Sequence, residues 1–138
     1  MKTKVLFLCT GNSCRSQMAE GFLRSLGGDS FEAHSAGTRP STLNPMAVEA
    51  MNELGIDISP QWSKNASEYL GTHFPYLVTV CDNAKESCPI FPGPAVRLHW
   101  SFEDPAEATG SDEQRRKVFR KVRDQIHARV KELVEKAG

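Results

Sequence analysis

The chain lacks an excess of charge of either sign. Its 138 residues include 17 lysines and arginines and 17 aspartates and glutamates, so the formal net charge is zero. Proteins that bind nucleic acids or anionic membranes carry a positive excess, and the composition therefore predicts neither partner. The basic run in residues 115–123 is interpreted as the solvated face of a helix, because acidic residues follow it.

The sequence also lacks a long hydrophobic run. No segment approaches the roughly 20 consecutive apolar residues of a transmembrane helix. The apolar stretch at residues 5–9 is too short for the core of a signal peptide, and no small-residue cleavage site follows it. We therefore expect no membrane segment and a cytoplasmic location.

The cysteines lack the C-x2-C spacing that structural zinc sites favour. Four residues separate Cys9 from Cys14, and six separate Cys81 from Cys88. A reducing compartment also disfavours a disulfide framework in a chain of this kind. We therefore expect no bound metal, and we interpret the cysteines as thiols that take part in chemistry.

Repeats, low-complexity tracts and linkers are absent as well, which predicts one domain over residues 1–138. Short apolar runs alternate with amphipathic segments along it. This alternation predicts an α/β fold with a small four-stranded parallel sheet and helices on both faces. The expected strands are residues 4–8, 31–35, 76–80 and 95–100, and the expected helices are residues 16–26, 45–54 and a long one after a capping box at Ser111 and Gln114.

Three chemically interesting positions follow strands of this predicted sheet. Cys9 ends the first strand, Cys81 ends the third, and a polar segment follows Trp100 at the end of the fourth. Ligands of open α/β sheets bind beyond the carboxyl ends of the strands. We therefore expect these positions to lie together at one edge.

The turn after Cys9 has the features of an oxyanion site. Gly11 and Asn12 tolerate the backbone conformations that turn successive N–H groups inward, and the following helix adds its positive end. Arg15 can bind two oxygens of a tetrahedral oxyanion. The same field favours the thiolate of Cys9, to which Ser16 can donate a hydrogen bond. The turn therefore predicts a thiolate that attacks the central atom of a bound oxyanion.

The predicted oxyanion-binding residues are Thr10, Gly11, Asn12, Ser13, Cys14, Arg15 and Ser16. A buried structural cysteine before an ordinary turn is the alternative for Cys9, because a Cys-x5-Arg pattern by itself is common.

The stretch CTGNSCRSQMAEG at residues 9–21 resembles the nucleophile loop of the low-molecular-weight tyrosine phosphatase fold, and within that fold it is most similar to the thioredoxin-coupled arsenate reductases. The resemblance covers nearly the whole chain. Its further motifs are SAG at 35–37, NP-A-EAM at 44–51, GIDIS at 55–59, VTVCDNAKESCP at 78–89 and HW-F-DPA at 99–106.

This resemblance implies reduction of arsenate to arsenite by a cysteine relay. Cys9 attacks arsenate, Cys81 displaces arsenite to give a transient Cys9–Cys81 disulfide, and Cys88 then attacks Cys81. Thioredoxin reduces the resulting Cys81–Cys88 disulfide, and no cofactor is bound. Seven positions span about 10.5 Å on an ideal helix and over 20 Å when extended, so this disulfide requires the segment to loop back. We expect the segment to differ between the redox forms.

The alternative within the same fold is a low-molecular-weight protein tyrosine phosphatase that uses Cys9, Arg15 and Asp104. Asp104 is the candidate general acid for either reaction, although an aspartate before proline is also an ordinary turn signal. Phosphatases of this fold usually carry an aromatic residue where this chain has Ala106, and proline where it has Gln17. A small inorganic substrate needs no stacking surface, so we favour the reductase.

Some relatives hold a potassium ion beside the loop with an Asn, a Glu, a Ser and an acidic residue. Asn12, Glu20 and Ser35 match this set, whereas Lys64 stands at the acidic position. An ammonium group there can replace the cation, so we expect no potassium. We expect a monomer whose partners are arsenate and thioredoxin. A glutathione–glutaredoxin donor and an oxyanion-binding module without turnover stay open.

Overall fold

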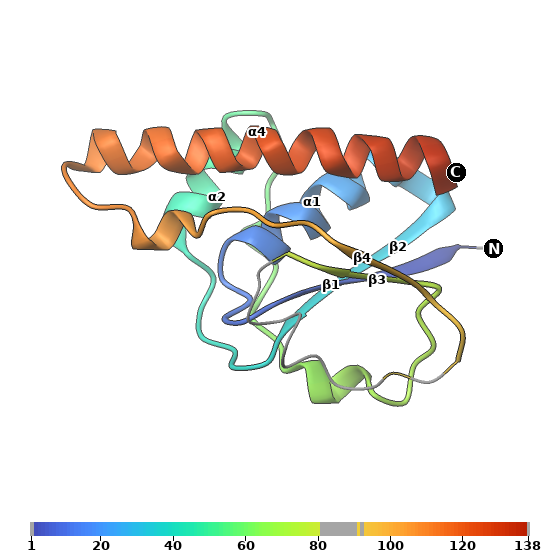
Figure 1. Ribbon diagram of the computed structural model, residues 1–138. Coiled ribbons are helices and arrows are strands. Elements are labelled where there is room, and N and C mark those ends of the chain that lie inside the picture. The colour runs from blue at the N-terminus through green and yellow to red at the C-terminus, as the bar shows by residue number, and fades with distance from the viewer. Residues whose placement is uncertain (1, 81–90, 92, 138) are drawn as a thin grey trace.

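The structure is a computed structural model that describes residues 2–80, 91 and 93–137. A parallel sheet of four strands has the order β2-β1-β3-β4 (Figure 1). The strands are β1 (Thr3–Cys9), β2 (Phe31–Gly37), β3 (Tyr76–Thr79) and β4 (Val96–His99). The predicted four-stranded parallel sheet is confirmed, and β3 pairs with β1.

The α-helices of the described residues lie on one side of the sheet in Figure 1, and the one-turn helix η2 (Ala66–Tyr69) lies on the other. They are α1 (Arg15–Gly27), α2 (Pro45–Asn52) and α4 (Asp112–Ala137). Two further one-turn helices are η1 (Gly28–Ser30) and η3 (Pro105–Glu107). Within the described part of the chain, no helix combines the length and apolar character of a membrane span.

The central strand β1 forms the middle of the core, because neighbouring strands flank it on both edges and side chains cover both faces. All five side chains of residues 5–9 are buried. On α4 an apolar residue recurs at every fourth position, and this row is buried only in its middle. The true buried face drifts because the helix has 3.6 residues per turn, and it comprises Phe119, Val122, Arg123, Ile126, Val130 and Leu133.

Two sequence signals set the helix boundaries. The backbone N–H of Ser111 donates to Gln114 Oε1 (2.8 Å) and that of Gln114 donates to Ser111 Oγ (3.2 Å), so the predicted capping box before α4 is confirmed. Helix α2 ends at Asn52, two residues before its predicted end. Gly55 has a φ of 76° and donates its N–H to the carbonyl of Asn52 (2.9 Å), which closes the helix earlier.

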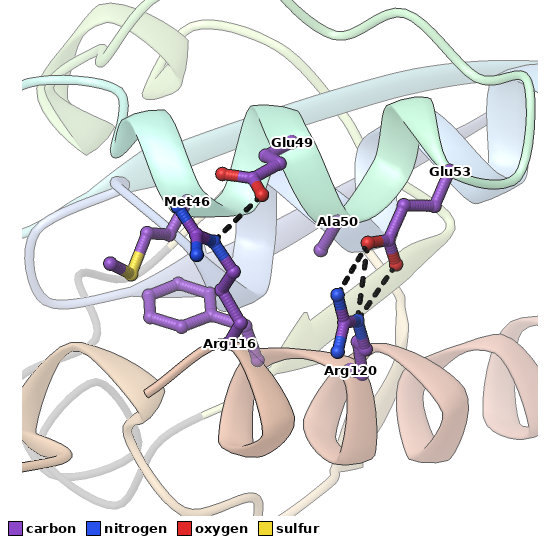
Figure 2. A pocket seen from close by; sticks show the side chains of 7 residues that line it. Met46, Glu49, Ala50, Glu53, Arg116 and Arg120 are labelled. Carbon is purple, nitrogen blue, oxygen red and sulfur yellow. Dashed lines mark hydrogen bonds and ion pairs between the residues drawn. The ribbon is translucent and has the colours of Figure 1, made fainter. Parts of the chain in front are cut away.

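The basic run of α4 is only partly a solvated face. Arg116 contacts Glu49 of α2 (2.8 Å) and Arg120 contacts Glu53 (2.9 Å), as Figure 2 shows. Arg123 is buried, donates to Glu53 (2.8 Å) and binds the carbonyl of Ala50. These arginines therefore join α4 to the carboxyl-terminal part of α2.

Candidate active site

Cys9 lies at the carboxyl end of β1 with 3% of its surface exposed. The backbone N–H of Asn12 donates to its Sγ (3.1 Å), and Ser16 Oγ lies 2.8 Å from the same sulfur. Hydrogen bonds to a sulfur from groups that can donate favour the thiolate. The contact between Ser16 and Cys9 predicted from the sequence is confirmed.

Asn12 is the centre of the loop after β1. Its φ of 50° is the one left-handed conformation among the described residues other than glycine, as the sequence predicts. Its Oδ1 accepts from the N–H of Lys64 (2.9 Å) and its Nδ2 donates to Ser16 Oγ (2.8 Å) and Ser35 Oγ (3.0 Å). Because the Ser16 oxygen accepts from Asn12, its own hydrogen is free to point at Cys9.

The outer side of the loop is held by residues 38–44, which sequence analysis did not assign to the site. Their N–H groups bind the carbonyl oxygens of loop residues 9–13 at N···O distances of 2.8 to 3.2 Å. Since the carbonyls are engaged from outside, the loop N–H groups are left for the inner, anion-binding side. The pairs are Thr38 to Cys9, Arg39 to Thr10, Ser41 to Gly11 and Asn44 to Ser13.

Gly37, at the end of β2, is the feature of the sequence that could have indicated that residues 38–44 lie against the loop. A Cβ at this position would collide with the carbonyl oxygen of Thr10 and lie 3.0 Å from the N atom of Asn12. The loop can therefore approach β2 this closely only where residue 37 has no side chain.

Arg15 begins α1 and points toward the segment after β4. Its guanidinium donates to the carbonyl of Phe102 (3.0 Å) and lies 3.6 Å from a carboxylate oxygen of Asp104. The other oxygen of Asp104 accepts from the N–H of Ala106 (3.0 Å), which caps η3. The structure thus brings the predicted oxyanion-binding cation and the predicted acid together.

Cys14 is part of the loop but is almost completely buried. It precedes α1, is 1% exposed, and burial raises the pKa of its thiol to about 12. A thiol of this kind is protonated at neutral pH and inert. Oxidation of Cys14 would require an exposed thiol, and this thiol is buried.

A buried polar cluster supports the loop from beneath. Glu20 Oε1 accepts from Ser35 Oγ (2.6 Å) and lies 3.5 Å from Lys64 Nζ, while its other oxygen contacts Arg24 (2.6 Å). Lys64 also donates to the carbonyl of Trp62 (2.7 Å). Burial lowers the pKa of Lys64, and the charge of Glu20 opposes this shift. The four positions compared with the potassium site do lie together, with an ammonium group among them.

Cys81 and Cys88, and with them the two predicted disulfides, lie outside the described residues. Val80, the last described residue before them, donates its N–H to the carbonyl of Leu8 (2.9 Å), next to Cys9. Among the residues that the structure does describe, no group of three or more His, Cys, Asp or Glu side chains is placed to hold a metal ion.

Residues 4–137 match the family described as low molecular weight phosphotyrosine protein phosphatase. The chain belongs to this family. Within it, the chain is 50% identical to an arsenate reductase of Shouchella clausii over 134 residues, which are 97% of this chain and 96% of the relative. A solved arsenate reductase in an oxidised state is 34% identical, covers 100% of both chains and superposes with a TM-score of 0.86.

The thioredoxin-dependent arsenate reductase of Corynebacterium glutamicum is also similar, with 27% identity and a TM-score of 0.76. This similarity covers 99% of the present chain and 64% of that one. The chain thus belongs to a family named for phosphatases, and the similar proteins named here are arsenate reductases.

Proposed function

We propose that this protein reduces arsenate to arsenite with Cys9 as the nucleophile. The observation that carries the proposal is the buried sulfur of Cys9 at the start of the predicted anion-binding loop, within hydrogen-bond distance of the N–H of Asn12 and the hydroxyl of Ser16. The arsenate reductases to which the chain is similar over nearly its full length support this substrate.

In the first step the thiolate of Cys9 attacks the arsenic atom of the bound oxyanion. Arg15 binds two of its oxygens, for which its contact with Asp104 has to be exchanged for the oxyanion. Asp104 donates a proton to the leaving oxygen, which departs as water and leaves arsenic bound to sulfur. This step changes no oxidation state.

In the second step the thiolate of Cys81 attacks the sulfur of Cys9. The new sulfur–sulfur bond forms as the sulfur–arsenic bond breaks, and the bonding pair leaves with arsenic as arsenite. Cys88 then attacks Cys81 and releases Cys9 as a thiolate. Thioredoxin supplies the two electrons that reduce the Cys81–Cys88 disulfide, as the thioredoxin-dependent relative suggests. Both cysteines lie outside the described residues, so these roles rest on the sequence.

Resident potassium has no part in this proposal. The described residues do not fit such a site, because the ammonium of Lys64 lies 3.5 Å from Glu20, the carboxylate that would bind the ion. We propose that this ammonium supplies the positive charge beside the loop.

A coupled assay tests the relay. Oxidation of NADPH is followed with arsenate, thioredoxin and thioredoxin reductase, for the wild type and for Cys81→Ser and Cys88→Ser. We expect steady turnover in the wild type only. In a single-turnover experiment without thioredoxin, Cys88→Ser should still release about one arsenite per enzyme, because the first disulfide can form. Cys81→Ser should release none.

Hydrolysis of para-nitrophenyl phosphate, measured beside this assay, tests the phosphatase alternative. Weak hydrolysis that survives both substitutions is expected of the fold. Phosphate ester hydrolysis without arsenate turnover would contradict the reductase. Turnover with glutaredoxin and glutathione in place of thioredoxin would identify a different donor, and arsenate binding without any turnover would identify a binding module.

A further inference from the structure

Gln17 is a polar side chain with none of its surface exposed, in the first turn of α1. Its Nε2 lies 2.9 Å from the carbonyl oxygen of Asn12, 2.8 Å from that of Trp62 and 3.0 Å from Asn12 Oδ1. Backbone carbonyls can only accept hydrogen bonds. This end of the amide must therefore be the NH2 group, and the side chain has only one possible orientation.

The other end of the Gln17 amide is fixed in the same way. Its Oε1 accepts from Nε2 of Gln61 (2.8 Å), and Nε2 of Gln61 also donates to the carbonyl of Gln17 (3.0 Å). Oε1 of Gln61 accepts from the guanidinium of Arg24 (3.3 Å). A guanidinium has donors and no acceptor, so Gln61 cannot turn over either.

We propose that Gln17 is a positioning residue for the nucleophile Cys9. It belongs to a chain of hydrogen bonds in which every donor points the same way, toward the sulfur. Since Gln17 holds Asn12 Oδ1, the Asn12 NH2 group faces Ser16, and the Ser16 hydroxyl is left to donate to Cys9. This inference rests on Cys9 being the nucleophile of the proposed function. The chain runs Arg24, Gln61, Gln17, Asn12, Ser16 and Cys9.

Other donors share this task, and they determine how large an effect to expect. The N–H of Lys64 also binds Asn12 Oδ1, and the hydroxyl of Ser63 also binds the Asn12 carbonyl. Loss of the Gln17 amide should therefore weaken the orientation of Asn12 without abolishing it. A glutamate at position 17 is more severe, because it places an oxygen against the three oxygens that surround Nε2 at 2.8 to 3.0 Å.

The test is the pH at which half of Cys9 reacts with iodoacetamide, with the peptide that carries it followed by mass spectrometry. The variants are Gln17→Met, which removes the amide, and Gln17→Glu, which reverses its polarity at nearly the same shape. We expect the midpoint pH to rise by about one unit in Gln17→Met and by more in Gln17→Glu. The kcat/KM for arsenate at pH 7 should fall about tenfold in Gln17→Met, mainly through kcat.

Two controls separate positioning from packing. Val130→Ala opens a cavity in the buried face of α4, far along the sequence from the loop. It should lower the unfolding temperature and leave the Cys9 midpoint unchanged. Gln125→Glu adds a negative charge on the exposed side of α4. It should change neither the unfolding temperature nor the Cys9 midpoint. Gln17→Met leaves the ionisable groups at the loop unchanged, namely Cys14, Arg15, Glu20, Lys64 and Asp104. Gln17→Glu adds a carboxylate there, so its shift contains the effect of that charge as well, and Gln17→Met is the variant that decides.

A Gln17→Met protein that is destabilised like Val130→Ala but keeps the wild-type midpoint would overturn the inference. If Gln17→Glu does not fold, Gln61→Leu replaces it and should shift the midpoint in the same direction by a smaller amount. The proposed function fails separately, namely if the wild type does not reduce arsenate although the midpoint still shifts with Gln17.

Discussion

The Nζ atom of Lys64 lies 3.5 Å from Oε1 of Glu20, and both side chains are almost completely buried, at 6% and 5% exposure. The ammonium thus sits within the cluster of Glu20, Ser35 and Asn12 that supports the nucleophile loop. A charge built into the chain cannot dissociate, in contrast to a bound ion. The activity of the wild type should therefore not depend on which monovalent cation is present. Replacing Lys64 should make the activity depend on it.

Initial rates of arsenate reduction should be the same in potassium and sodium chloride at equal ionic strength. In Lys64→Asp a second carboxylate joins Glu20, and oxygen ligands of this kind suit a hard cation. We expect this variant to lose activity in sodium and to recover part of it in potassium. A wild-type rate that doubles in potassium would contradict the assignment of Lys64.

Cys14 should be silent in thiol labelling of the folded protein. Its pKa of about 12 leaves roughly one thiolate in ten thousand molecules at pH 8, and the sulfur is buried besides. Iodoacetamide at pH 8, followed by peptide mapping, should label Cys9 well before Cys14. Labelling in guanidinium chloride should reach both cysteines. Rates within tenfold of each other in the folded protein would show that Cys14 is accessible.

Gly37→Ala should damage oxyanion binding more than it damages the fold. The added methyl group displaces the Thr10 carbonyl or the Asn12 backbone, and displacements of about 1 Å at a reacting centre cost up to 100-fold in rate. Arsenate or phosphate bound in the loop should protect Cys9 from alkylation by iodoacetamide. We expect the concentration needed for half protection to be at least about tenfold higher in Gly37→Ala.

Gly71→Ala is the matched control for this substitution, because a Cβ there meets no atom within 4 Å. In Gly71→Ala, arsenate or phosphate should protect Cys9 as well as it does in the wild type. Equal protection in Gly37→Ala would mean that the loop can shift without cost.

The contacts of Glu53 should make stability depend on pH. Hydrogen bonds from Arg120, and then from Arg123, hold the pKa of Glu53 below its ordinary value. A depressed carboxyl pKa stabilises the fold above the ordinary value, and this contribution is lost as the pH falls through the folded-state pKa. We expect Glu53→Gln to lower the unfolding temperature by about 3 °C at pH 7 and by less below pH 4.

Thermal unfolding of both proteins between pH 3 and pH 7 measures this effect. Glu135→Gln, on the exposed side of α4 near its end, is the control and should give no such pH-dependent difference. A Glu53→Gln difference that is constant over this range would show that the ion pairs with Arg120 and Arg123 do not matter.

Much of the sheet and the nucleophile loop is readable from neighbouring residues. The apolar run around Phe7 is a buried strand because only a central strand can be apolar at every position. Asn12 is left-handed because its side chain tolerates that conformation and the turn requires it. The contact between Cys9 and Ser16 follows from the turn length, since the helix begins within a few residues of the strand end.

Other features could not be read in this way. The period of four along α4 covers only the middle of its buried face, because the helix has 3.6 residues per turn and the packing against α1 and α2 decides which side is covered. Arg116 and Arg120 looked like solvated charges because nothing near them in sequence indicates Glu49 and Glu53, about 67 positions away.

By itself the sequence determined the local chemistry of this protein: which strand ends in a thiol, which turn can bind an oxyanion and which residues can cap a helix. These follow from backbone preferences and side-chain types of residues a few positions apart. Only the tertiary structure decided that Gln61 meets Gln17 and that residues 38–44 hold the loop carbonyls. Those contacts join residues 29 to 44 positions apart, and their geometry depends on how whole elements pack.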